Sequence, residues 1–275
     1  MTGQRQADAV TSRLATCLAA VRQAAPLTLR WFRRPDLAVV EKADRSPVTE
    51  ADRAAETLLR DTLLAAHPGD AFLGEETGVV AGGSGFEWIV DPIDGTKSFI
   101  RGVPLYAMLV GCRHEGRGVL GVIAIPALDE CVYATSGGGA WHSAGGGPPA
   151  RARVSGRRRL DESLLCTSDF ASFGRRSDGV AGRLARQRAE DACQLTRTWG
   201  DGYGYLLVAT GRAEAMVDPI MNAWDAAAVE TVVVEAGGRF TDWQGRERID
   251  SGEGVATNGL VHDELLGLLH PFPRP

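Results

Sequence analysis

Apolar residues recur at two different spacings in the first half of the chain, and each spacing predicts a type of element. Between residues 5 and 32 they return every three or four positions, which predicts a helix that Pro26 should kink or end. The same spacing predicts a second helix from residue 49 onward. Shorter apolar runs predict strands at 71–73, 86–90, 105–112, 119–125, 131–134 and 140–142. A charged turn separates the runs 105–112 and 119–125, so these two strands are expected to form an antiparallel hairpin.

Strands and helices alternate more regularly in the second half. Strands are predicted at 164–167, 213–217, 239–241 and 254–257, and helices at 180–189, 202–210, 224–236 and 260–269. This order favours α/β packing there, against an antiparallel α+β first half. The glycine- and proline-rich stretch 145–149 is the best candidate boundary between the halves 1–148 and 149–275.

The composition argues against nucleic-acid-binding and membrane proteins. The chain has 275 residues, 44% of them hydrophobic, with a net charge of −5 and a pI of about 5.6. Acidic character argues against nonspecific nucleic-acid or membrane-surface binding, and the arginines between 151 and 159 are interpreted as a solvated face. No apolar run reaches the roughly 20 residues of a membrane span, and the N-terminus lacks signal-peptide features. We therefore expect a cytoplasmic protein with no nucleic-acid or membrane partner, and we expect it to form a homodimer.

The cysteines and histidines do not indicate a metal site. The five cysteines are widely spaced, without a CxxC pair, and are expected to be reduced and mostly buried thiols. The five histidines show no metal-ligand spacing, so each is expected at the surface or in a turn.

The strongest candidate chemistry lies in the segment 88–99, Trp-Ile-Val-Asp-Pro-Ile-Asp-Gly-Thr-Lys-Ser-Phe. The run 86–90 predicts a buried strand that delivers Asp91 to its carboxyl end, where ligands collect in α/β proteins. Pro92 biases Asp91 toward an extended conformation, and the chain should then turn. If Ile93 points its side chain inward, its carbonyl faces outward beside Asp91 and Asp94. Three hard oxygen donors are then expected to converge.

The next two residues suit an anion. Gly95 lets backbone approach a ligand closely, and Thr96 stands where a short helix could begin and offer N–H groups. This arrangement predicts a cation site next to a phosphate site. The alternative is an Asx-rich turn that caps the strand.

Thr49 and Asp52 have the spacing of a helix-capping box at the start of the second helix. In that motif the acid reaches back to the backbone N–H of the cap. This structural role alone would explain Asp52.

Two further motifs support a catalytic interpretation. Gly-Glu-Glu at 74–76 follows a short apolar run, and Trp-Asp-Ala-Ala at 224–227 opens an apolar helix that ends at Gly-Gly, 237–238. Together with the Asp-Pro-Ile-Asp-Gly-Thr motif, they resemble the inositol monophosphatase family of magnesium-dependent, lithium-sensitive phosphomonoesterases. The resemblance extends from Lys42 to about Asn258. It implies a layered α-β-α-β-α sandwich.

The resemblance also implies a magnesium site built from oxygen ligands, which magnesium prefers. Glu75, Asp91 and the carbonyl of Ile93 would bind one Mg²⁺. Asp91, Asp94 and Asp225 would bind a second, so that Asp91 bridges the pair. The alternative for Asp225 is a charge favoured at a helix N-terminus. Whether a third Mg²⁺ takes part in turnover is left open.

The same pattern assigns catalytic roles. Water is the expected nucleophile, oriented by Thr96 and Asp52 with help from the metal ligand Glu75. Backbone N–H groups of Gly95 and Thr96 would hold the phosphate oxygens. Lys42 matches a lysine that the family keeps near its metal site, although it could equally be a solvated surface lysine.

The expected substrate is a small phosphorylated metabolite. The segments 199–212 and 218–222 resemble the histidinol-phosphatase branch of the family, which implies L-histidinol phosphate, with inositol 1-phosphate as the main alternative. The cationic end of histidinol phosphate needs acceptors, which Asp201 and Asp218 would supply, with Asn258 as a further polar contact. Asp201 could instead cap a helix. Fructose-1,6-bisphosphate, an adenosine bisphosphate and a catalytically silent magnesium-binding regulator are weaker alternatives.

Overall fold

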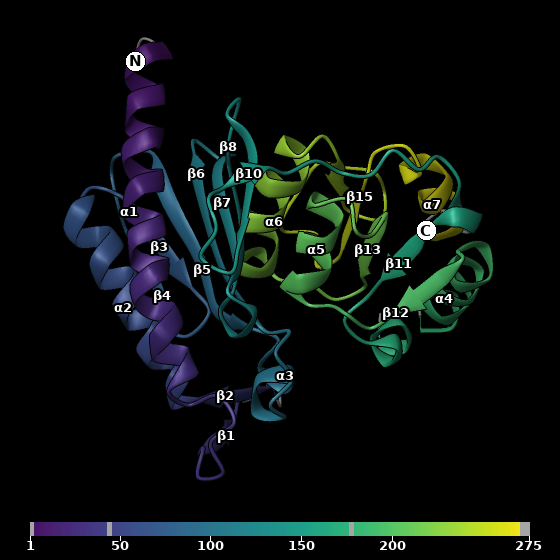
Figure 1. Ribbon diagram of the computed structural model, residues 1–275, viewed down its shortest axis with the longest axis horizontal. Helices are drawn as coiled ribbons and strands as arrows, with labels where there is room; N and C mark the ends of the chain where they lie inside the picture. Colours follow the sequence, from purple (N-terminus) through teal and green to yellow (C-terminus); the bar gives the residue numbers. More distant parts are fainter. Residues whose placement is uncertain (1–2, 43–45, 176–178, 270–275) are drawn as a thin grey trace.

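The computed structural model describes residues 3–42, 46–175 and 179–269, and it has the expected layered architecture (Figure 1). Two sheets alternate with three layers of helices. The outer layer on the first sheet contains α1 (Gly3–Leu29) and α2 (Glu50–Ala66). The middle layer contains α5 (Gly202–Ala209) and α6 (Ala223–Glu235), and the outer layer on the second sheet contains α4 (Gly179–Ala192) and α7 (His262–Leu269). The predicted α-β-α-β-α sandwich is confirmed.

The first sheet has eight strands in the order β10-β9-β8-β7-β6-β5-β3-β4. They are β3 (Ala71–Gly74), β4 (Gly78–Val80), β5 (Phe86–Asp94), β6 (Ala107–His114), β7 (Arg117–Ile125), β8 (Glu130–Thr135), β9 (Gly139–Ala144) and β10 (Ala150–Arg151). The predicted hairpin is β6 with β7, and only β3 and β5 pair in parallel among these strands. A separate small hairpin joins β1 (Val39–Glu41) to β2 (Pro47–Thr49), and α3 (Thr96–Ile100) follows β5.

The second sheet is mixed. Its strands are β11 (Leu164–Cys166), β12 (Leu195–Arg197), β13 (Ala215–Asp218), β14 (Arg239–Thr241) and β15 (Gly254–Thr257), in the order β12-β11-β13-β15-β14. Only the pairs made by β11 are parallel. Short 3₁₀ turns occur at η1 (Pro126–Leu128), η2 (Leu160–Glu162) and η3 (Phe170–Arg175). None of the described helices is long and apolar enough to cross a membrane.

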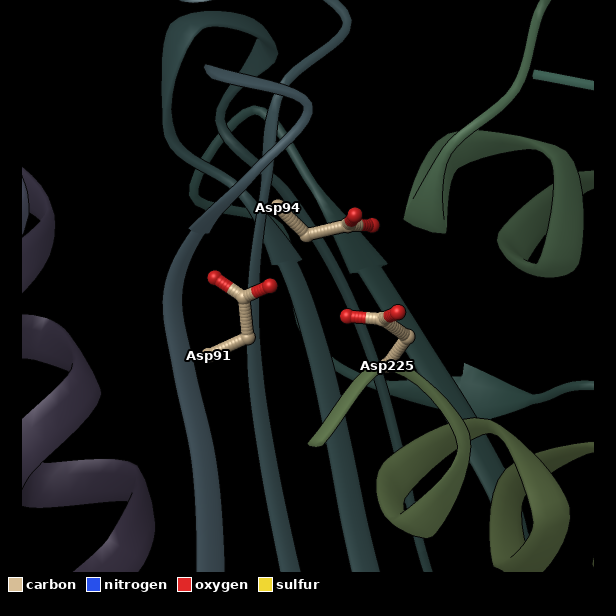
Figure 2. A group of neighbouring side chains, drawn as sticks. All are labelled: Asp91, Asp94 and Asp225. Carbon is tan, nitrogen blue, oxygen red and sulfur yellow. The ribbon is translucent and has the colours of Figure 1, made fainter. Parts of the chain in front are cut away.

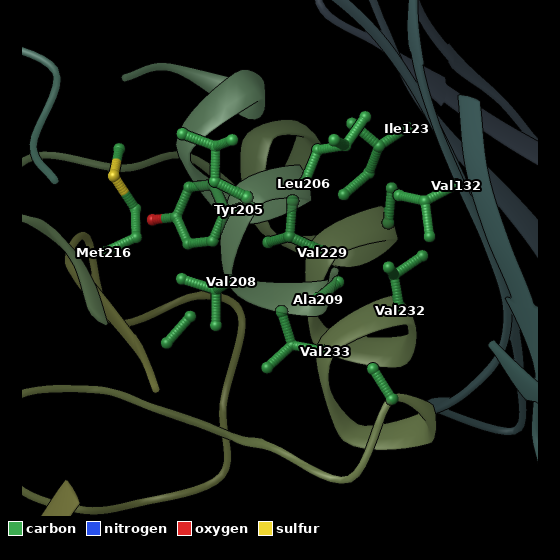
Figure 3. Close-up of a cluster of buried hydrophobic side chains, with 14 of the residues drawn as sticks. Ile123, Val132, Tyr205, Leu206, Val208, Ala209, Met216, Val229, Val232 and Val233 are labelled. Atoms are coloured by element: carbon green, nitrogen blue, oxygen red, sulfur yellow. The ribbon is translucent and has the colours of Figure 1, made fainter. Parts of the chain in front are cut away.

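The middle helices form a core that both sheets share (Figure 3). Val229 and Val232 of α6 and Leu206 of α5 are fully buried against Ile123 and Val132 of the first sheet. On the other side, α5 packs against the second sheet. The core therefore contains residues from both sides of position 148, and the two halves pack as one body.

Small residues let α6 lie directly on the first sheet. A Cβ atom at Gly121 would stand 2.3 Å from the backbone oxygen of Ala228, and one at Gly111 would stand 2.7 Å from the Cβ of Ala227. Any larger side chain at these positions would push the helix away. The close contact brings the first turn of α6, which carries Asp225, to the end of β5.

Candidate metal centre and active site

The strand β5 continues through Asp94, four residues beyond the predicted end at 90. Its register against β6 shifts between Asp91, which pairs with Leu109, and Asp94, which pairs with Ala107. Three steps on β5 thus match two steps on β6, as in a β-bulge. In a regular strand residues three apart point to opposite faces, and the extra residue turns both carboxylates to the same side. The predicted turn after Val90 is therefore a bulge inside the strand.

Three carboxylates converge at this point (Figure 2). Asp91 and Asp94 project from β5, and Asp225 faces them from the first turn of α6. One ligand oxygen from each lies within 4.8 Å of the others. Asp225 also accepts a hydrogen bond from the backbone N–H of Asn222, which fixes it at the start of the helix. The helix-terminal position predicted for Asp225 is confirmed.

The electrostatics of this cluster favour a bound cation. Burial, followed by the charges of Glu75 and Asp94, raises the pKa of Asp91 well above its ordinary value. Burial also raises the pKa of Asp225 to about 7, although the N–H of Asn222 opposes the shift. Among the described residues no lysine or arginine pairs with any of the three aspartates. All-oxygen donors with unrelieved repulsion fit a divalent ion such as magnesium.

Glu75 lies in the turn between β3 and β4 and lines the same cavity of about 300 Å³ as Asp91 and Asp225. Lys42 donates to Glu75 at 2.8 Å and to Glu76 at 2.5 Å. Burial alone would lower the pKa of Lys42, but the hydrogen bonds to the two glutamates raise it. Of the two interpretations of Lys42, the structure favours the one that places it beside the site. Residues 43–45, which follow Lys42, lie outside the described residues.

Asp52 connects the capping box to the candidate site. Its carboxylate is fully buried and accepts hydrogen bonds from the backbone N–H of Thr49 at 2.8 Å and from its hydroxyl at 2.5 Å. The other carboxylate oxygen lies 3.4 Å from the hydroxyl of Thr96. Burial raises the pKa of Asp52, which the hydrogen bonds from Thr49 partly offset. The capping box is confirmed, and the same side chain also reaches Thr96.

Ile93, Gly95 and Thr96 also line the cavity of about 300 Å³. The side chain of Ile93 is buried as expected, and its carbonyl accepts a hydrogen bond from the Thr96 hydroxyl at 3.1 Å. Gly95 has a φ of 82°, and a Cβ atom there would stand 2.5 Å from Oδ2 of Asp201. Glycine is therefore required both by the backbone conformation and by the close approach of Asp201.

A second cavity of about 190 Å³ adjoins the carboxylate cluster and is lined by Asp201 and Asp218. Asp218 accepts hydrogen bonds from the hydroxyl of Ser168 at 2.5 Å and from that of Tyr205 at 2.8 Å. Burial raises its pKa to about 6 against the opposing effect of these two hydroxyls. Asp201 is the N-cap residue of α5, as the alternative expected, but its side chain makes no capping hydrogen bond, so capping does not account for its carboxylate. The structure thus brings both aspartates to the wall of one cavity.

Asn258 is not part of the site, which corrects the prediction. It is 2% exposed, and its amide nitrogen donates to the Ser155 hydroxyl and the Arg157 carbonyl. Its side-chain oxygen accepts from the backbone N–H groups of Leu260 and Val261. Each of these bonds holds the loop before α7. The side chain has no hydrogen-bonding capacity left for a substrate.

His262 also differs from expectation, because it is fully buried at the start of α7 rather than at the surface. One ring nitrogen lies 3.0 Å from the Thr241 hydroxyl and the other 3.0 Å from the Thr257 hydroxyl. Burial lowers the pKa of His262 to about 4. The histidine thus has a packing role remote from the carboxylates. His67, His114 and His142 are partly exposed, and His270 lies outside the described residues.

Ser168 and Tyr205 were not predicted as site residues. Both hydroxyls donate to Asp218, and both side chains line the second cavity. Tyr205 falls in the segment 199–212 that suggested the substrate, but its apolar neighbours there suggested only a buried helix. Ser168 follows a short strand and carries no motif. Neither could be found without the packing of α5 against β13, which ends at Asp218.

Comparisons with known proteins find relatives that match nearly the whole chain. The profile of the inositol monophosphatase family matches residues 10–271. A histidinol-phosphatase of Chlorobaculum parvum is 43% identical over 94% of this chain and 97% of its own length. A histidinol-phosphatase of Mycobacterium tuberculosis is 41% identical with the same coverage. The crystal structure of the extragenic suppressor protein suhB from Bartonella henselae superposes with a TM-score of 0.85 at 29% identity, covering 94% of this chain and 98% of that one. The chain belongs to the inositol monophosphatase family, whose enzymes are in general magnesium-dependent.

Proposed function

We propose that this protein is a magnesium-dependent phosphatase that hydrolyses L-histidinol phosphate to L-histidinol and phosphate. The observation that carries the proposal is the adjacency of two acidic cavities. The first is lined by the cluster Asp91, Asp94 and Asp225. The second shares Asp94 and Asp225 and adds Asp218, and its aspartates, with Asp201, outnumber the two cations that also line it, Lys97 and Arg175. The first suits metal-assisted chemistry on a phosphate, and the second suits a substrate with a cationic end. Relatives named histidinol-phosphatase, at 41–43% identity, support the same substrate.

The residues that would hold two Mg²⁺ ions are Glu75, Asp91, Asp94, Asp225 and the carbonyl of Ile93. When bound, magnesium supplies positive charge that polarises the phosphoryl oxygens and makes a bound water more acidic. Asp91 would be shared by both ions, because the bulge turns it to the same side as Asp94 and one of its oxygens lies within 4.8 Å of Asp225 as well. When Thr96 donates its one proton to Asp52 instead of to the Ile93 carbonyl, the lone pairs of that carbonyl are free for a metal ion.

Asp52 and Thr96 would act together on the attacking water. A hydroxyl has one proton to donate and two lone pairs. If Thr96 donates its proton to Asp52, its oxygen can accept a hydrogen bond from water and so direct a lone pair of the water oxygen toward phosphorus. Burial raises the pKa of Asp52, which suits a group that takes up a proton. Glu75 lines the same cavity and would assist the water while it binds metal.

The phosphate and the amine of the substrate would bind at opposite ends of the joined cavities. Backbone N–H groups of Gly95 and Thr96 would donate to the phosphate oxygens at the floor of the first cavity. Asp201 and Asp218 would accept hydrogen bonds from the ammonium group and the imidazole in the second. Inositol 1-phosphate has no cationic group and would gain less from this pair.

The test is a comparison of phosphate release from L-histidinol phosphate and inositol 1-phosphate by the same enzyme with saturating Mg²⁺. We expect a kcat/KM at least tenfold higher for L-histidinol phosphate, since a hydrogen bond to a charged group contributes about 1.5–3 kcal/mol. A clear preference for inositol 1-phosphate would overturn the substrate but leave the phosphatase activity in place. Release from neither compound would overturn both.

A further inference from the structure

Glu56 is a buried acid with an unusual pair of partners. It lies in α2, is fully buried, and accepts hydrogen bonds from two backbone N–H groups, that of Glu76 at 2.9 Å and that of Thr77 at 2.6 Å. Each N–H contacts a different carboxylate oxygen. Among the described residues no lysine or arginine forms an ion pair with Glu56. A buried carboxylate without a cation is costly, so its position calls for an explanation.

The contacts of Glu56 enclose Glu75 from both sides. On one side, the carboxylate holds the N–H groups of Glu76 and Thr77. On the other, it lies against the backbone of Gly74, where a Cβ atom would stand 2.2 Å from its Oε1. Gly74 ends β3, and Glu75 is the next residue. The turn that presents Glu75 to the cavity is therefore built around the Glu56 carboxylate.

The same helix also reaches the other side of the site. Asp52 precedes Glu56 by one helical turn on the same face, and its carboxylate lies 3.4 Å from the Thr96 hydroxyl. Leu59 and Leu63 anchor this face of α2 in the first sheet's core and are fully buried. The first two turns of α2 thus set the spacing between Thr96 and Glu75, although neither lies on the helix.

We propose that Glu56 is a positioning residue that fixes Glu75 in the orientation that binds Mg²⁺. A carboxylate is required because each of its oxygens accepts one backbone N–H, whereas an amide offers a single acceptor oxygen. Loss of one bond frees the turn, and Glu75, which already pairs with Lys42, is then no longer held toward Asp91. Residues that orient metal ligands typically change metal affinity or activity by 10–100-fold when they are replaced.

The test measures Mg²⁺ binding directly, by calorimetric titration of metal-free protein in the absence of substrate. Glu56→Gln is the main variant, and Gly74→Ala disturbs the same contact from the other side. Glu214→Gln is the control, because Glu214 is also a buried acid that accepts a backbone N–H, from Leu164. It differs in pairing with Arg157 at 3.5 Å, and it lies in the second sheet region. We expect Glu56→Gln and Gly74→Ala to weaken Mg²⁺ binding by at least about tenfold, and Glu214→Gln to leave it within about twofold.

A second readout separates positioning from catalysis. The Mg²⁺ concentration for half-maximal phosphate release should rise in Glu56→Gln, whereas kcat at saturating Mg²⁺ should recover most of the wild-type value. Unchanged Mg²⁺ affinity in a folded Glu56→Gln or Gly74→Ala protein would overturn the inference, as would an equal loss in Glu214→Gln. The inference rests on the proposed magnesium site, and the two fail differently. Wild-type protein that binds no Mg²⁺ contradicts the proposed function, whereas equal binding by wild type and Glu56→Gln contradicts only the role of Glu56.

Discussion

Two groups of aspartates line the two adjoining cavities, and their surroundings differ. The first group is Asp91, Asp94 and Asp225, and the second is Asp201 and Asp218. Asp91, Asp94 and Asp225 lie within 4.8 Å of one another, without a basic partner among the described residues. Asp218 in the neighbouring cavity accepts hydrogen bonds from two hydroxyls, those of Ser168 and Tyr205. Each aspartate of the first group accepts a backbone N–H, but the three carboxylates still repel one another. Asp218, in contrast, is held by two hydroxyls.

This difference shows how aspartate can serve either to bind a metal ion or to select a substrate. Repulsion among buried carboxylates is relieved most effectively by a multivalent cation, so the first group favours metal. Hydrogen bonds from hydroxyls hold the Asp218 carboxylate in place and leave lone pairs for a weaker, more selective contact with a ligand. The first group should therefore control whether the enzyme works, and the second which substrate it prefers.

The largest expected effect comes from Asp91→Asn. Asp91 is the one side chain proposed to contact both ions, and its replacement removes a charge and an oxygen donor together. We expect phosphate release to fall by about a thousandfold or more, as loss of several kcal/mol of charge stabilisation implies. Steady-state assays at rising Mg²⁺ concentrations measure this. Near-normal turnover at saturating Mg²⁺ would show that the cluster does not act as proposed.

Thr96→Ala should have a smaller effect of a different kind. It removes the hydroxyl that lies 3.4 Å from Asp52 and 3.1 Å from the Ile93 carbonyl. Turnover should fall by about 100-fold, the lower range for a positioned proton-transfer group, while Mg²⁺ affinity stays close to wild type. Thr96→Ser, which keeps the hydroxyl, is the matched control and should retain most activity. A large loss of Mg²⁺ binding in Thr96→Ala would contradict this division of roles.

Asp201→Asn addresses the second group of aspartates. The substitution keeps the shape of the side chain next to Gly95 but removes its charge. We expect kcat/KM for L-histidinol phosphate to fall by about tenfold, consistent with one weakened charged hydrogen bond. Inositol 1-phosphate, which has no cationic group, serves as the control substrate and should be affected less. An equal loss for both substrates would mean that Asp201 does not discriminate between them.

The smallest effect concerns stability and lies outside both groups. His262 has a folded-state pKa of about 4, below its ordinary value of about 6.5. Between these values the unfolded chain binds the proton and the folded protein does not, so stability is present above pH 6.5 and is lost as pH falls toward 4. Melting temperatures at pH 7 and pH 5 should differ by a few degrees more in wild type than in His262→Gln. The same pH dependence in both proteins would contradict the assignment.

Much of the fold could be predicted because it depends on local patterns. The spacing of apolar residues located α2, α6 and the β6–β7 hairpin, and Thr49 with Asp52 marked the start of α2. The bulge in β5 could not be predicted, because it exists only relative to the register of β6. The strands of the small β1–β2 hairpin and β12 were missed, since three-residue strands carry almost no periodicity.

The site could be predicted where its residues fall in compact motifs. Asp91 and Asp94 are close in sequence, and Asp225 follows a recognisable tryptophan. Asn258 was wrongly assigned, because nothing local showed that Ser155 and Arg157 take up its amide. The partners of such a side chain depend on long-range packing, which the periodicity of the sequence does not reveal.

The most direct test of the central claim is phosphate release from L-histidinol phosphate by protein freed of metal with a chelator and then titrated with Mg²⁺. The proposed site has oxygen ligands only, so we expect no measurable release without metal and full recovery as Mg²⁺ is restored. Undiminished release after exhaustive chelation would contradict the account.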